Sequence, residues 1–325
     1  MKELQNRFKA KTLIFTHGDS DGICSGAIAK TAYPDAYVYF TNPVNLLDKL
    51  SLIENVKTLI ICDIAIDERN CSELHAKLNE LAKKCNLYYI DHHPLPESCQ
   101  KENWFYHDTE VCSSELTYRF FEKRLNRDMR RIAIYGAIGD FCDNTPHVES
   151  WVKDWDKRNL YFQAGTLTQA ILYKGKEYEF KRKLLEPLSK DIIPSNIPEL
   201  LELAREAAIN EEKIRVFVKE NVEVLENSAY VVNTNNSISK AAIYAASYGR
   251  REVGIAAEYR EKNGAYDLSI RSRGEIDVNQ ILRSVASKFG GSGGGHPLAA
   301  GARIPEDSLN AFLRAFDKKL GKAHG

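Results

Sequence analysis

The chain has 325 residues, which is too long for one ordinary hydrophobic core and about right for two domains. It is 43% hydrophobic and 28% charged, a composition typical of a folded protein and not of a disordered one. Lysine plus arginine and aspartate plus glutamate both total 45, so no net charge would hold the chain on a long duplex, and any nucleic-acid contact must be local. No segment approaches the ~20 apolar residues of a membrane span. We therefore expect a cytoplasmic protein without a membrane partner.

Seven cysteines are scattered along the chain, and no two of them form a CxxC pair. This pattern indicates neither a disulfide framework nor a cysteine-based zinc site. We expect the cysteines to be reduced and mostly buried in the core.

Five short apolar runs in the first half of the chain are separated by helical-looking stretches. They are TLIFT (12–16), AYVYF (36–40), TLIICD (58–63), LYYID (87–91) and WFYHD (104–108). Because their apolar character is continuous and does not alternate, the runs predict an α/β fold in which a parallel sheet has helices on both faces. From about 111 to 185 the pattern is helical throughout.

The stretch 186–200 contains three prolines, and a charged, helix-like segment follows it. Proline ends the preceding helix and the charges solvate the next one, which predicts a first domain at 1–190 and a helical linker at 191–225. Residues 226–325 predict a smaller α/β domain. Its expected elements are a strand at 229–233, a helix after it, strands at 251–259 and 265–272, a helix starting near Asp277, and a glycine loop at 290–301.

Acidic and imidazole side chains, the types that can bind metals, follow three of the predicted strands at the point where each strand ends. These residues are His17, Asp19 and Asp21, then Asp63, and then Asp91, His92 and His93. The carboxyl ends of parallel strands meet in one crevice, where clustered carboxylates would raise one another's pKa values unless a cation neutralises them. An oxygen-rich set with imidazoles suits Mn²⁺ or Mg²⁺. A bridging carboxylate with ligands on both sides predicts two ions roughly 3.5 to 4 Å apart.

Each of these acids also has a simpler interpretation when it is taken alone. Asp63 or Asp140 could be a turn former or a helix cap, and Asp19 and Asp21 before Gly22 could be a turn and a cap. The coincidence of ligand-type residues at three separate strand ends favours the metal site.

Four segments in the first half resemble the successive motifs of the DHH phosphoesterase superfamily, in that family's order. They are HGDSDGICSG (17–26), ICD (61–63), IDHHP (90–94) and GAIGD (136–140). The resemblance implies a hydrolase with two Mn²⁺ ions, for which Mg²⁺ could substitute. One ion would be held by His17, Asp19 and Asp63, and the other by Asp21, Asp63, His92 and Asp140, so that Asp63 bridges them.

The same resemblance implies catalytic roles for Asp63, His92 and His93. His93 would face the substrate phosphate or the attacking water, while Asp91 would orient a histidine by accepting its second N–H. One feature departs from the pyrophosphatase and oligoribonuclease branches, where the first histidine lies three residues ahead of the acidic pair. Here the tighter spacing of His17, Asp19 and Asp21 is similar to the branch of the RecJ exonucleases and their archaeal relatives, and the ion that His17 binds is left open.

The segment GGSGGGHPLAAG (290–301) resembles the GGGHxxAAG signature of the DHH-associated domain. Glycines without a Cβ can expose successive N–H groups to an anion, although a flexible linker is the alternative. The resemblance implies that a terminal phosphate or base is held by Gly293, Gly294, Gly295 and His296. Arg271 and Arg273 would contact phosphate, because the guanidinium matches its oxygens bidentately. Taken alone, either arginine would more often be a solvated surface residue.

Three functional hypotheses follow. The first is a RecJ-like exonuclease or oligoribonucleotide hydrolase that cuts short single-stranded RNA or DNA with water activated by two metal ions. The second is a small-nucleotide phosphodiesterase or phosphatase acting on linear or cyclic dinucleotides or on pAp. The third is a non-catalytic replisome scaffold, which predicts missing metal ligands. Polarity of digestion, preference for RNA or DNA, and oligomeric state are left open.

Overall fold

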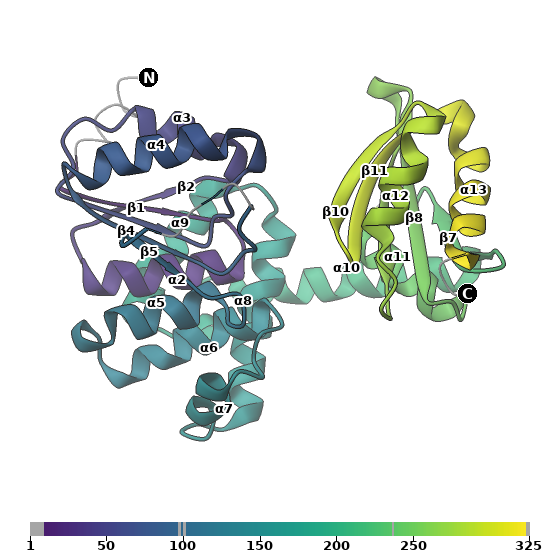
Figure 1. Ribbon diagram of the computed structural model, residues 1–325. Coiled ribbons are helices and arrows are strands. Elements are labelled where there is room, and N and C mark those ends of the chain that lie inside the picture. Colours follow the sequence, from purple (N-terminus) through teal and green to yellow (C-terminus); the bar gives the residue numbers. More distant parts are fainter. Residues whose placement is uncertain (1–9, 97–98, 100–101, 236, 323–325) are drawn as a thin grey trace. The chain divides into compact units, whose positions relative to one another are not determined.

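The computed structural model describes residues 10–96, 99, 102–235 and 237–322. The chain divides into two compact units, Met1–Ala207 and Ala208–Gly325, and each unit is built on one β-sheet (Figure 1). Among the described helices, none combines the length and the apolar character needed to cross a lipid bilayer.

The first unit contains the predicted parallel sheet. Its strands are β1 (Thr12–Thr16), β2 (Tyr37–Phe40), β3 (Thr58–Cys62), β4 (Asn86–Asp91) and β5 (Phe105–His107). Their order in space is β2-β1-β3-β4-β5, and every neighbouring pair is parallel. The expected strand positions and their direction are therefore confirmed.

Helices cover both faces of this sheet, as predicted (Figure 1). Leu13 and Leu59 point to one face and pack in a buried cluster with residues of α3 (Pro43–Ser51) and α4 (Cys71–Ala82). Ile14 and Ile60, the next residues along the same strands, belong to a cluster on the other face. The helices of that second cluster are α2 (Ser20–Ala32), α5 (Ser113–Phe121), α6 (Arg130–Gly139), α7 (Pro146–Val152), α8 (Lys157–Lys174) and α9 (Tyr178–Ser189).

The expectation that all cysteines are reduced is wrong for one pair. Cys71, at the start of α4, forms a disulfide with Cys99, and their Cα atoms lie 6.5 Å apart. The two residues are separated by 28 positions and match no spacing motif. Their proximity arises because the chain that follows β4 passes the beginning of α4, which is a tertiary relationship that spacing alone does not reveal.

Helix α10 (Leu200–Asn221) lies within the segment 191–225 that the sequence predicts to be a helical linker, and the division between the units falls inside this helix. The second unit is built on a mixed sheet of order β10-β11-β9-β8-β7-β6, in which β7 and β8 are parallel and the other pairs antiparallel. The strands are β6 (Glu223–Val224), β7 (Ser228–Val232), β8 (Val253–Arg260), β9 (Ala265–Ser272), β10 (Ser292–His296) and β11 (Ala299–Pro305).

Helices also pack on both faces of the second sheet. Helix α11 (Ile238–Tyr248) shares a buried cluster with Ala256 of β8, whereas α12 (Val278–Ala286) and α13 (Leu309–Gly321) share another with Ile255. Neighbouring residues of one strand thus face opposite layers, as the period of two requires. A smaller α/β unit in the C-terminal part of the chain is confirmed.

The glycine segment of the second unit is a strand and not the expected loop. Residues Ser292–His296 form the edge strand β10, which pairs antiparallel with β11. A Cβ on Gly293 would lie 2.7 Å from the carbonyl oxygen of Gly301, and one on Gly295 would lie 2.4 Å from that of Ala299. These two glycines therefore permit β10 and β11 to pack closely. A run of glycines looks the same in the sequence whether it serves close packing or forms a flexible loop.

Candidate metal centre

The residues proposed as metal ligands lie at the carboxyl edge of the parallel sheet and at the end of α6. His17 and Asp19 follow β1, and Asp63 follows β3. His92 follows β4, and Asp140 directly follows the last residue of α6. Asp19 is also the N-cap of α2, where its Oδ1 accepts a hydrogen bond from the N–H of Gly22. The capping interpretation of Asp19 and its place in the cluster are therefore compatible.

The structure brings the six proposed ligands and His93 together as three overlapping groups. In each group, one ligand atom from every residue lies within 4.8 Å of the others. The groups are His17, Asp19 and Asp63; Asp63, His92 and His93; and Asp21, His92 and Asp140. The first group contains the ligands proposed for one ion, and the third contains three of the four proposed for the other.

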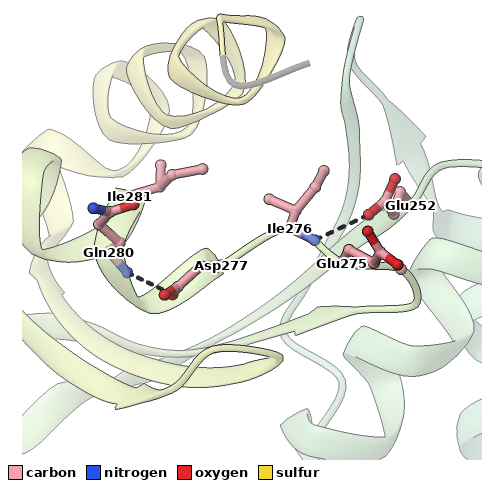
Figure 2. Close-up of a pocket in the computed structure, with 7 residues that line it drawn as sticks. Glu252, Glu275, Ile276, Asp277, Gln280 and Ile281 are labelled. Carbon is pink, nitrogen blue, oxygen red and sulfur yellow. Dashed lines mark hydrogen bonds between the residues drawn. The ribbon is translucent and has the colours of Figure 1, made fainter.

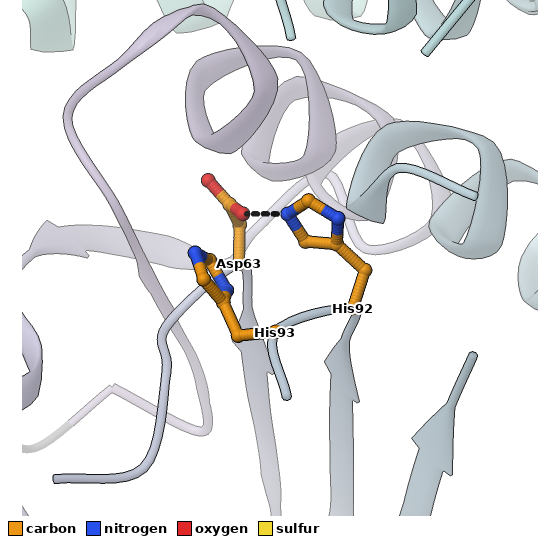
Figure 3. Close-up of side chains that lie close together, drawn as sticks. All are labelled: Asp63, His92 and His93. Atoms are coloured by element: carbon orange, nitrogen blue, oxygen red, sulfur yellow. Dashed lines mark ion pairs between the residues drawn. The ribbon is translucent and has the colours of Figure 1, made fainter. Parts of the chain in front are cut away.

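Asp63 joins the two halves of the cluster. Its Oδ1 pairs with Nε2 of His92 (Figure 3), and these two atoms are 3.4 Å apart; its Oδ2 lies 3.9 Å from Nδ1 of His17. The side chain is only 2% exposed, and Oδ2 has no hydrogen-bond partner. A Cβ on Gly22 would lie 2.9 Å from this oxygen, so glycine at that position keeps the space beside it open. An unpartnered, buried carboxylate oxygen next to imidazoles fits a bound cation.

The backbone of Asp63 supports the same interpretation. Its φ is 56°, in the left-handed region that residues other than glycine seldom occupy. Such conformations cost free energy and are found mainly where a functional geometry demands them. The turn after β3 thereby directs the carboxylate toward His92.

Asp21 is held in a different way. It is almost fully buried, and its two carboxylate oxygens accept hydrogen bonds from the N–H groups of Ser113 and Ser114, at 2.8 and 2.9 Å. These are the first two residues of α5, whose N-terminal dipole favours a negative charge. A Cβ on Gly136 would come within 2.8 Å of Oδ1 of Asp21, so this glycine of the GAIGD motif allows α6 to approach.

Burial and mutual repulsion raise the pKa values of three of the carboxyl groups. For Asp63 and Asp21 burial is the main cause, and the charge of Asp19 adds to both pKa values. Burial, followed by the charge of Asp21, raises the pKa of Asp140 to about 6. Carboxylates that repel one another in this way fit a site whose charge is completed by a divalent cation. The hard oxygen donors with imidazoles suit Mn²⁺ or Mg²⁺.

His93 lies at the edge of the cluster, and Asp91 orients it. Oδ1 of Asp91, a fully buried residue, lies 2.9 Å from Nδ1 of His93. Burial alone would lower the pKa of His93, but the hydrogen bond and charge of Asp91 raise it above the ordinary value. Asp91 thus fixes the orientation of the His93 ring, and Nε2 is the ring nitrogen that is left to contact another group.

Two of the proposed substrate-binding residues of the second unit, His296 and Arg271, lie in one row across neighbouring strands of the sheet. In the sheet, His296 is opposite Ala299, and Ala299 is opposite Arg271. Directly opposite residues of antiparallel strands project to the same face, and the small Ala299 leaves space between the two larger side chains. Nη2 of Arg271 donates a hydrogen bond to Oγ of Ser239, while Arg273 is exposed beyond the end of β9.

A pocket of the second unit has the opposite electrostatic character. Glu252, Glu275 and Asp277 line it, and Figure 2 shows Ile276 between Asp277 and the two glutamates. Oδ1 of Asp277 accepts a hydrogen bond from the N–H of Gln280 and caps α12. Because three acidic side chains would repel a phosphate, this pocket is unsuited to an anionic substrate.

Four residues that shape the candidate metal centre were not expected from the sequence. Ser113 and Ser114 act through their backbone N–H groups, which leave no signal in the sequence. Gly136 is the first residue of the GAIGD motif, which is the signal in the sequence that points to it. Lys181 of α9 is buried, and its Nζ donates a 2.5 Å hydrogen bond to the carbonyl oxygen of Gly18. Nothing in the helical pattern of α9 distinguishes this lysine from its solvated neighbours.

Comparisons with known proteins agree with this architecture. Residues 203–322 match the DHHA1 domain family. The bifunctional oligoribonuclease and PAP phosphatase NrnA of Bacillus subtilis is 22% identical over 301 residues, which cover 85% of this chain and 82% of that protein.

Two solved structures share the fold. Exonuclease RecJ bound to manganese has a TM-score of 0.68 at 15% identity, covering 98% of this chain and 94% of that one. The pGpG-specific phosphodiesterase PggH of Vibrio cholerae has a TM-score of 0.63 at 13% identity, covering 96% and 99%. The four motifs in the first unit, the DHHA1 match in the second and this shared fold lead to one conclusion: the chain is similar to the DHH phosphoesterases over both of its units.

Proposed function

We propose that this protein hydrolyses phosphodiester bonds in short single-stranded nucleic acid, as a metal-dependent exonuclease or oligoribonucleotide hydrolase. The observation that carries the proposal is the series of three overlapping ligand groups, of which the middle one shares Asp63 with the first and His92 with the third. Such an arrangement has donors on both sides of one carboxylate, as a centre with two ions requires. The names of the relatives, an oligoribonuclease and an exonuclease, support the same class of substrate.

Two Mn²⁺ ions, or Mg²⁺ in their place, would supply Lewis-acid chemistry and neutralise the phosphate charge. His17, Asp19 and Asp63 would hold one of them, and Asp21, Asp63, His92 and Asp140 the other. The chain's own residues prepare the site: α5 fixes Asp21 through Ser113 and Ser114, and the left-handed turn at Asp63 aims the shared carboxylate.

His93 is in a position to act on the substrate. Asp91 holds its Nδ1, so Nε2 is the nitrogen that remains for a phosphate oxygen or the attacking water. The raised pKa favours the protonated ring, which donates to a phosphate oxygen. Arg271 and His296, in one row of the second sheet, and the neighbouring Arg273 and glycines 293–295 are proposed to bind the substrate's terminal phosphate or base.

A length series of RNA substrates tests the proposal. RNA from dinucleotide to pentanucleotide, labelled separately at each end and incubated with Mn²⁺, should be shortened to mononucleotides. Asp63→Asn should abolish this activity, whereas Asp48→Asn, which changes an exposed acid on α3 of the same unit, should leave it unchanged. Intact oligonucleotides after incubation with the Mn²⁺-loaded protein would refute the nuclease assignment.

The second candidate is a phosphodiesterase or phosphatase for small nucleotides, such as linear or cyclic dinucleotides or pAp. The relatives named as a PAP phosphatase and as a pGpG-specific phosphodiesterase favour it. In the same length series, activity confined to the dinucleotide or to pAp would select this candidate. A non-catalytic scaffold is disfavoured because each of the proposed metal ligands is present.

A further inference from the structure

A pocket of about 450 Å³ opens beside the candidate metal centre, within the first unit. His17 and Asp19 form its wall on the side of the cluster, and Phe141, Leu172 and Tyr178 are among the other lining residues. These come from three separate places: the turn after α6, the end of α8 and the start of α9. The pocket therefore continues the proposed catalytic site along the protein.

Phe141 is the most unusual residue of this pocket. Its side chain is 91% exposed, and its φ is 59°. A bulky residue in the left-handed region is a genuine outlier, and strained backbone of this kind concentrates at functional sites. Phe141 also directly follows Asp140, one of the proposed metal ligands. Hydrophobic packing does not explain an aromatic ring held in this position, because the ring faces solvent.

The other walls combine apolar and cationic groups. The ring of Tyr178 stacks on Phe40, with centroids 6.0 Å apart and an interplanar angle of 23°, so its position is fixed from behind. Leu172 is 56% exposed, and Lys176 adds an exposed positive charge to the rim. Aromatic faces beside a cationic rim suit a flat heterocycle that carries a negative charge at one end.

We infer that this pocket binds a nucleobase of the substrate, and that Phe141 provides the face on which the base stacks. The inference rests on the proposed function, because the phosphate joined to that nucleoside would lie at the neighbouring ligand cluster. Stacking accepts any base, since every base has a π face. The pocket thus binds a nucleotide next to the scissile phosphate without selecting its sequence.

Dinucleotides with and without bases provide the test. The substrates are a dinucleotide and two counterparts, each of which lacks the base at one of the two positions. For the unaltered protein, one abasic counterpart should have a KM about tenfold higher than the complete dinucleotide, within the range expected for loss of one stacked base. Phe141→Ala should raise KM for the complete dinucleotide to a similar extent and leave that abasic counterpart unaffected, with kcat nearly unchanged.

Three controls separate this role from a structural one. Phe141→Tyr should retain the low KM, because tyrosine also presents an aromatic face. Phe162→Ala, which removes an exposed aromatic ring of α8 outside the pocket, should have no effect. Mn²⁺ affinity and melting temperature of Phe141→Ala should match those of the unaltered protein, which shows that Asp140 is undisturbed.

The outcomes distinguish the two proposals. If the unaltered protein hydrolyses the dinucleotide and Phe141→Ala raises KM equally for complete and abasic substrates, or for none of them, the nucleobase site is refuted while the phosphodiesterase assignment stands. If the unaltered protein hydrolyses none of these substrates, the proposed function itself fails, and the inference fails with it.

Discussion

Asp21 and Ser114, which are 93 positions apart, are joined by a 2.9 Å hydrogen bond from the backbone N–H of Ser114 to Oδ1 of Asp21. The N–H of Ser113 donates a second hydrogen bond, to Oδ2, so both oxygens of the carboxylate accept hydrogen bonds from the N-terminus of α5. Asp63 differs, because its Oδ2 has no hydrogen-bond partner. We therefore expect Asp21 to stabilise the metal-free protein and Asp63 to destabilise it. Substituting each acid by asparagine tests the two effects separately.

Asp21→Asn should destabilise the metal-free protein. The amide of asparagine offers one acceptor and one donor, so one of the two buried N–H groups of α5 loses its partner. Leaving a buried donor unsatisfied costs about 1–3 kcal/mol, which lowers the melting temperature by several degrees. Calorimetry in the presence of a chelator measures the effect. A melting temperature equal to that of the unaltered protein would contradict the structural role of Asp21.

Asp63→Asn should have the opposite effect on the metal-free protein. Burial and the neighbouring carboxylates raise the pKa of Asp63 well above its ordinary range, so the charged form is unfavourable in the fold at neutral pH. Asparagine removes the charge and tolerates the left-handed backbone. The melting temperature with chelator should rise, and the further rise on adding Mn²⁺ should disappear.

The exposed Asp48 of α3 is the matched control for this substitution. Asp48→Asn should retain both the melting temperature with chelator and its increase with Mn²⁺. A full Mn²⁺-dependent increase in Asp63→Asn would show that the shared carboxylate is not a metal ligand.

Metal binding should weaken as pH falls through about 6. The folded pKa of Asp140 is about 6, against an ordinary value of 3.8, so the metal-free fold takes up a proton in this window. A raised carboxyl pKa makes the metal-free fold relatively more stable toward low pH, while a cation must displace the same proton. The difference in melting temperature between Mn²⁺-loaded and metal-free protein should therefore narrow from pH 7.5 to pH 5. If this difference in melting temperature stays constant over that pH range, protonation of the ligand cluster does not compete with Mn²⁺ binding, and the prediction is wrong.

The disulfide between Cys71 and Cys99 should be detectable by peptide mapping. Under non-reducing conditions the two peptides should stay linked, whereas the partly exposed Cys85 and Cys142 react with iodoacetamide. Cys99→Ser should lower the free energy of unfolding by about 2–4 kcal/mol, as removal of a typical native disulfide does. Alkylation of Cys71 in the unreduced native protein would show that the bond is not formed.

The sequence by itself determined the parallel sheet and the identity of the candidate ligands. Continuous apolar runs predicted β1, β3 and β4 almost to the residue, because strands buried on both faces admit few polar side chains. The acids and histidines that follow these strands were recognisable because the carboxyl ends of parallel strands share one edge. The resemblance to the DHH superfamily was recognisable in the same motifs, since their order and residue types are local features of the chain.

Only the tertiary structure decided how each side chain is held. The partners of Asp21 are backbone groups of Ser113 and Ser114, and any residue type supplies an N–H, so no pattern predicts this contact. The glycine segment 292–296 became an edge strand because Ala299 and its neighbours in β11 were available to pair with it. The bond between Cys71 and Cys99 likewise depends on where two distant segments pass each other. Such contacts arise from packing between elements, which is a property of the folded chain and not of any single segment.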